Sequence, residues 1–69
     1  MVKFIRCQDK IYIIHNPCEY ETSTQIEQEL KQLLTPKCLK VFRLNTGVDE
    51  EFAEELENKC EEVDPYSLI

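Results

Sequence analysis

Glycine, tryptophan and long apolar runs are scarce in this sequence. Its 69 residues include one glycine, three prolines and no tryptophan. A single glycine cannot build a phosphate-binding P-loop, a dinucleotide-binding turn or an EF-hand loop, so these sites are excluded. The longest apolar run, residues 11–14, is far shorter than the roughly 20 residues of a membrane span, and the N-terminus has no secretory signal pattern. We therefore expect a cytoplasmic chain without a membrane segment, in its own cell or in an infected host cell.

Positive charge is scarce in the last third of the chain. Residues 1–48 carry seven Lys/Arg and five Asp/Glu, a net charge of +2, whereas residues 49–69 carry one Lys and nine Asp/Glu, a net charge of −8. The acidic third repels polyanions and attracts basic protein surfaces, so a protein partner is expected rather than nucleic acid. Basic residues interleaved with aromatics, as in a platform for base stacking, are also missing. The alternative is a solvated surface that only keeps a small protein soluble.

The N-terminal quarter of the chain has the pattern of a β-hairpin. Residues 2–7 and 11–15 are rich in β-branched and aromatic side chains, and polar residues 8–10 separate them. Residues 11–14 are all apolar, which suits a strand covered on both faces or one that forms part of an interface. The dipeptide Asn16-Pro17 ends this second strand, because proline cannot donate to a sheet.

Two amphipathic helices and a third strand are predicted after the hairpin. The first helix, residues 24–34, begins with a capping box formed by Thr24 and Glu27 and ends before Pro36. Residues 38–44 form the third strand, and a second helix runs from Asp49 as N-cap to Asp64-Pro65. The side chains expected in the core of these helices are Leu30, Leu33, Phe52 and Leu56.

The order ββαβα predicts a small two-layer α+β domain. A crossover through the first helix makes strands 2 and 3 parallel, which gives a three-stranded mixed sheet with both helices on one face. Residues 1–64 form this single domain, and residues 65–69 form a short C-terminal tail. The end of that tail, Ser67-Leu68-Ile69, loosely fits peptides that add a strand to a PDZ-type groove.

This arrangement leaves the outer face of the sheet uncovered. Ile5, Tyr12, Ile14 and Phe42 supply the apolar side chains for that face. Exposed apolar patches mark partner or self-association surfaces, so we expect Tyr12 and Ile14 to bind a partner and a homodimer to be an option. The alternative is a different register, with the tail folded across the sheet.

Four cysteines are many for so short a chain, but their spacing fits no standard site. The separations between Cys7, Cys18, Cys38 and Cys60 contain no CxxC pair, so a zinc knuckle or a thioredoxin-type pair is not indicated. Free thiols are the expectation, with Cys18 the most exposed. Cys7, His15, Cys18 and Cys38 remain as an alternative metal or redox set. A nucleophile made of Cys18 and His15 lacks an orienting third group, so no catalytic residue, enzyme activity or cofactor is expected.

Two hypotheses about function follow from these patterns. The first is a non-enzymatic, acidic protein-binding module, of the kind that viruses and phages encode as inhibitors or adaptors of larger host proteins. Its partner has a basic surface, and its contacts include an acidic ridge on the second helix made of Glu50, Glu54, Glu57 and Glu61. The second hypothesis is a thiol redox or structural-metal protein. Thiol titration together with metal analysis distinguishes the two.

Overall fold

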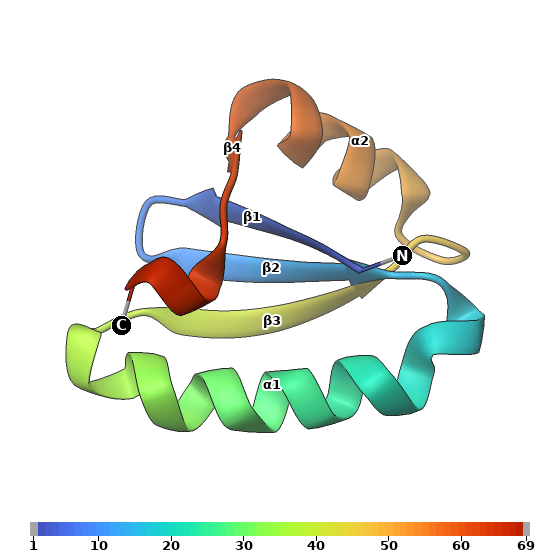
Figure 1. Cartoon of the computed structure of the whole chain (residues 1–69). Helices are drawn as coiled ribbons and strands as arrows, with labels where there is room; N and C mark the ends of the chain where they lie inside the picture. Colours follow the sequence, from blue (N-terminus) through green and yellow to red (C-terminus); the bar gives the residue numbers. More distant parts are fainter. Residues whose placement is uncertain (1, 69) are drawn as a thin grey trace.

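A computed structural model describes residues 2–68 as a small α+β domain with two helices and a mixed sheet (Figure 1). The elements are β1 (Lys3–Cys7), β2 (Lys10–His15), η1 (Pro17–Glu19), α1 (Tyr20–Leu34), η2 (Thr35–Lys37), β3 (Lys40–Asn45), α2 (Glu50–Lys59), β4 (Glu61–Glu62) and η3 (Pro65–Leu68), where η marks a 3-10 turn. The sheet has the order β3-β2-β1-β4. As predicted, β1 and β2 form a hairpin and β2 and β3 are parallel. The sheet has four strands rather than three, because β4 pairs antiparallel with β1.

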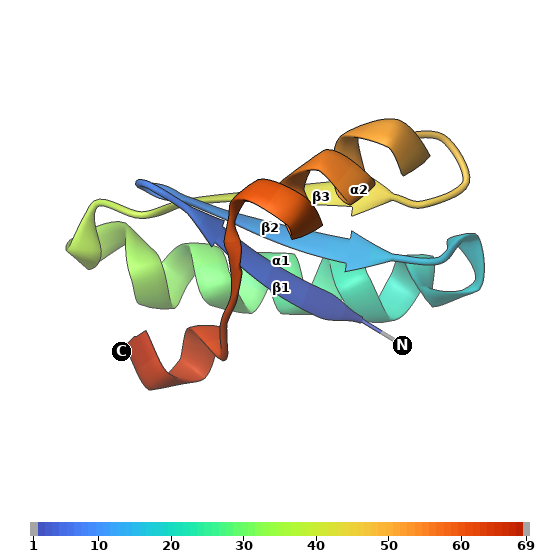
Figure 2. The ribbon, with the colours of Figure 1, turned by 90° about the horizontal axis from the view of Figure 1, so that it is seen from above.

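The two helices lie on opposite faces of the sheet, which corrects the prediction of a single covered face (Figures 1 and 2). Because side chains alternate along β2, Ile11 and Ile13 pack against α1, whereas Ile14 packs against α2. Each face of the central strand therefore has its own cover. The unbroken apolar run of β2 is the sequence signature of this three-layer arrangement.

The core is consequently divided into two clusters with the sheet between them. The α2-side cluster consists of Ile5, Ile14, Leu44, Ala53 and Leu56. The α1-side cluster consists of Ile11, Ile13, Leu30, Leu34 and Val41. Leu30 and Leu56 are buried as predicted, but Leu33 is only half-buried and Phe52 is 43% exposed. Leu34 occupies the buried position expected for Leu33.

Helix α1 begins four residues before the expected start. The Glu19 carboxylate accepts a hydrogen bond from the Asn16 backbone N–H at 3.0 Å, so the turn is stabilised directly after β2. Thr24, predicted as the cap, instead lies inside the helix and donates its hydroxyl proton to the Tyr20 carbonyl at 2.8 Å. The helix ends at Leu34 and continues as η2 through Pro36, in line with the expected stop.

Helix α2 ends at Lys59, before the predicted Asp64-Pro65 stop. Cys60 has extended backbone angles, and Glu61 lies in β4 rather than on the helix as predicted. The chain then crosses the edge of the sheet toward α1 (Figure 2). There Pro65 is buried and Leu68 packs against the α1-side cluster. Residue 69, the end of the predicted PDZ-type peptide, lies outside the described residues.

Candidate protein-binding surface

Three aromatic rings form a row on the α2 side of the sheet. The parallel register places Phe42 of β3 directly beside Tyr12 of β2, and their rings stack with centroids 5.7 Å apart. Phe52, in the first turn of α2, meets the Tyr12 ring edge to face, with centroids 5.7 Å apart. Phe42 is 42% exposed and Phe52 is 43% exposed, whereas Tyr12 is half-buried between them. We call these three residues the aromatic row.

A shallow hollow of about 550 Å³ adjoins the aromatic row where α2 begins. The loop before α2 is held by Asn45, whose carbonyl accepts the N–H groups of Val48 at 3.0 Å and Asp49 at 2.7 Å. This turn leaves the Val48 side chain 82% exposed. The hollow is lined by Gly47, Val48, Asp49, Glu50, Glu51, Phe52 and Glu55, so exposed apolar groups lie among four carboxylates.

The carboxylates of α2 are divided between two flanks of the helix. Glu51 and Glu55 line the hollow beside Phe52, and Glu55 pairs with Lys59 at 2.6 Å. The predicted ridge residue Glu57 lies on the other flank, where it pairs with Lys3 of β1 at 3.2 Å. Glu54 lies on the same flank as Glu57, because residues three apart are about 60° apart around a helix. Helical spacing alone defines the two flanks, but the orientation of α2 on the sheet decides that the Glu57 flank meets Lys3.

Seven of the nine acidic side chains in residues 49–69 form no ion pair with any of residues 2–68. They include the five exposed glutamates Glu50, Glu51, Glu54, Glu61 and Glu62. The negative charge of the C-terminal third therefore remains largely uncompensated at the surface.

The two sheet residues predicted to bind a partner occupy different environments. Tyr12 is at the centre of the aromatic row and keeps part of its surface accessible. Ile14 is 4% exposed and packs beneath α2 with Leu44 and Leu56. Phe42, predicted on the same face of the sheet, and Phe52, which was expected in the core, complete the accessible surface.

A second depression runs along the free edge of β3. Its volume is about 560 Å³, and it is lined by Lys31, Thr35, Cys38, Leu39, Lys40, Val41 and Phe42. β3 is an end strand of the sheet, and its Lys40 N–H points inward to the Asp9 carbonyl of the hairpin turn at 2.8 Å. By alternation, the backbone groups of Val41 and Arg43 point away from β2. This edge carries lysines, in contrast to the acidic flanks of α2.

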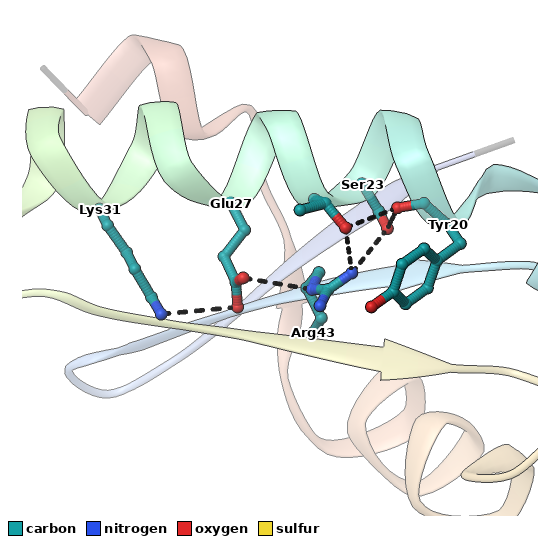
Figure 3. Close-up of polar contacts among 6 residues, drawn as sticks. Tyr20, Ser23, Glu27, Lys31 and Arg43 are labelled. Atoms are coloured by element: carbon teal, nitrogen blue, oxygen red, sulfur yellow. Dashed lines mark hydrogen bonds and ion pairs between the residues drawn. The ribbon is translucent and has the colours of Figure 1, made fainter.

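The Arg43 side chain of β3 is turned toward α1. Its Nη1 donates to Thr24 Oγ1 at 2.7 Å and lies 3.4 Å from Ser23 Oγ, and its Nε lies 3.2 Å from Glu27 Oε1 (Figure 3). The guanidinium also stacks on Tyr20, with its carbon 4.9 Å from the ring centroid. All of these partners belong to α1. The cluster therefore fastens the helix to β3.

The alternative metal set is dispersed over the molecule. Cys7 lies at the hairpin end of β1, whereas His15 lies at the far end of β2, about 16 Å away along the strand. Cys18 and Cys38 are exposed at opposite ends of α1. His15 is 3% exposed, with Nδ1 2.9 Å from the Asn16 carbonyl oxygen. Within residues 2–68, no three His, Cys, Asp or Glu side chains are grouped closely enough to hold a metal ion.

All four cysteines are free thiols in the structure, and two of them meet. Cys7 and Cys60 are half-buried against the α2-side cluster. A hydrogen bond with Cys7, together with burial, raises the pKa of the Cys60 thiol above its ordinary value. The sequence spacing gave no indication of this pair, because the two residues are brought together only by β4.

Neither helix of the described chain has the length and apolar composition required to cross a bilayer. Comparison of the chain with protein-family models, curated proteins and solved structures gives no match.

Proposed function

We propose that this chain is a non-enzymatic protein-binding module that acts as an inhibitor or adaptor of a larger protein. The observation that carries the proposal is the aromatic row of Phe42, Tyr12 and Phe52, with two rings more than 40% exposed. Partly exposed aromatic side chains held in a fixed geometry are typical centres of protein interfaces. Val48 extends this apolar surface into the hollow beside α2.

The chemistry of the partner follows from the charges around the row. Glu51 and Glu55 flank Phe52, and the unpaired carboxylates of α2 continue away from it. An apolar side chain flanked by lysine or arginine matches this combination in shape and charge. Association is therefore expected to slow as salt is added, since exposed charge pairs are screened.

The proposal is tested by affinity capture from a lysate of the organism that encodes the chain, with variants that distinguish the surfaces. Phe42→Ser removes one end of the row, and Tyr66→Ser removes an aromatic ring that is 41% exposed outside the row. We expect Phe42→Ser to reduce binding of a captured protein tenfold or more, and Tyr66→Ser to leave it unchanged. Calorimetry with the purified pair then measures the dissociation constant.

Three charge reversals locate the electrostatic contribution. Glu51→Lys changes the hollow, Glu54→Lys changes the outer flank of α2, and Glu29→Lys makes the same chemical change on exposed α1. A loss of affinity with Glu51→Lys or Glu54→Lys, but not with Glu29→Lys, supports a basic partner. If all three bind as the wild type does, the carboxylates serve solubility alone. Equal binding by Phe42→Ser and the wild type refutes the aromatic interface.

A further inference from the structure

We infer that Cys7 and Cys60 form a reversible cross-strand disulfide when the protein meets a disulfide oxidant such as glutathione disulfide. This modification site is independent of protein binding. Three observations support the disulfide: the register of β1 and β4, the half-burial of both thiols, and the separation of the other two cysteines.

The register places the two cysteines directly opposite each other. Ile5 pairs with Glu62 and Arg6 pairs with Glu61, so the next pair along the antiparallel ladder is Cys7 with Cys60. Cys60 has the extended backbone angles φ −124° and ψ 167° that this continuation requires.

The hydrogen-bond pattern defines which kind of pair this is. The Val63 N–H donates to the Phe4 carbonyl at 2.9 Å, so Phe4 and Val63 form a hydrogen-bonded pair. Pairs alternate along an antiparallel ladder, and Cys7 with Cys60 therefore falls at a non-hydrogen-bonded position. In agreement, the Cys60 N–H donates to the Leu56 carbonyl at 2.8 Å instead of crossing to β1. The Cα atoms of such a pair are about 4.5 Å apart, within the range that a disulfide spans.

The side chains also point to the same side of the sheet. Cys7 and Cys60 both pack against the cluster that contains Ile5 and Leu56. Hydrogen bonding to the Cys7 thiol, together with burial, raises the pKa of the Cys60 thiol, in agreement with this placement. The remaining thiols of Cys18 and Cys38 are exposed and separated by the length of α1, about 22 Å, so they cannot join within one molecule.

The reaction is thiol–disulfide exchange. A thiolate of the pair attacks one sulfur of glutathione disulfide, which breaks the S–S bond and releases a glutathione thiolate. The neighbouring thiolate then attacks the protein sulfur of the mixed disulfide and releases the second glutathione thiolate. The protein loses two electrons and two protons, the released thiolates take up those protons, and two molecules of glutathione result. Since a raised pKa leaves little Cys60 thiolate at neutral pH, cross-linking should accelerate from pH 7 to pH 9.

The test uses the double variant Cys18→Ser/Cys38→Ser, in which both substituted side chains are exposed. After incubation with glutathione disulfide under native conditions, intact mass spectrometry should show the loss of two hydrogens and no attached glutathione. Peptide mapping should join the Cys7 and Cys60 peptides, and dithiothreitol should restore the original mass. Wild-type protein should carry the same link and additional glutathione on Cys18 and Cys38.

A matched variant examines whether the neighbouring thiol resolves the mixed disulfide. In Cys7→Ser/Cys18→Ser/Cys38→Ser, Cys60 has no partner and should retain one glutathione. The cross-linked double variant should melt about 10 °C or more above its reduced form, because the bond closes a loop that spans most of the chain. Protein that stays reduced, that keeps glutathione on Cys7 or Cys60, or that melts lower when cross-linked would overturn the inference.

Discussion

Arg43 fastens β3 to α1 through Thr24, Glu27 and the ring of Tyr20. Its side chain is 22% exposed and that of Glu27 is 18% exposed, so solvent screens this ion pair only partly. We expect Arg43→Ala to lower the free energy of unfolding by about 2 kcal/mol, because the Glu27 charge then loses its strongest partner. Arg43→Lys should recover only part of the loss, since an ammonium cannot stack and make several hydrogen bonds at once.

Urea denaturation in a double-mutant cycle measures this interaction. The coupling between Arg43 and Glu27 should be about 1 kcal/mol or more. Lys31 pairs with the same carboxylate at 3.7 Å, but its side chain is 57% exposed, so its coupling with Glu27 should be only about 0.3 to 0.5 kcal/mol. Equal couplings for the arginine and the lysine would contradict the fastening role of Arg43.

Gln8 stores backbone strain in the two-residue turn between β1 and β2. Its φ angle is +60°, in the left-handed region that side chains disfavour, and its carbonyl accepts a hydrogen bond from Arg6 Nε at 3.0 Å. Replacement by glycine relieves this strain, so Gln8→Gly should stabilise the protein by about 0.5 to 1 kcal/mol. Gln28→Gly, on exposed α1, should instead destabilise it by about 1 kcal/mol. Thermal melts of both variants check the opposite signs, and a loss of stability in Gln8→Gly would refute the strain.

At the scale of elements, the sheet separates two core clusters, and adjacent residues of β2 belong to different clusters. Ile13 is fully buried on the α1 side, and Ile14 is 4% exposed on the α2 side. Each change to valine should cost about 0.5 to 1.5 kcal/mol. In native-state hydrogen exchange, Ile14→Val should lower protection chiefly in α2, and Ile13→Val chiefly in α1. A uniform loss of protection in both variants would show that the two layers open together.

The elements that local patterns define were predictable from the sequence. The hairpin, the parallel pairing of β2 with β3 and the stop after Leu34 follow from apolar spacing and prolines. β4 was not predictable, because Glu61 and Glu62 continue the acidic pattern of α2 and pair only through β1. The position of α2 also depends on the tertiary fold, since its short apolar stripe fits either face of the sheet.

The candidate surface was predictable only in part for the same reason. Tyr12 was identified because β2 has more apolar residues than one buried face needs. Phe42 was predicted on the same face of the sheet, and the strand register places it directly beside Tyr12. Phe52 joins them only through the docking of α2, which the linear sequence does not define. Phe52 was expected in the core because it lies on the apolar stripe, yet it sits at the rim of that stripe beside Glu55.

At the scale of the whole molecule, the open edge of β3 is the place where a second copy can add. Lys40 begins this strand, and lysines on edge strands oppose such pairing. We expect Lys40→Val to promote self-association in sedimentation velocity at high protein concentration. Lys10→Val is the matched control, because Lys10 is the register partner of Lys40 on the central strand β2. If the two variants sediment identically, Lys40 does not oppose self-association at this edge.

The path of the chain around the edge of β1 has a consequence for synthesis. Residues 61–68 leave the ribosome after every other described element. They nevertheless pair with the outer edge of β1 and then pack against the α1-side cluster. Until they emerge, the nascent chain holds β1 as an unprotected strand. A neighbouring nascent chain on the same messenger RNA can supply those residues instead. We therefore expect crowded translation to promote domain-swapped dimers joined through β4, and slow, dilute synthesis to promote the closed monomer.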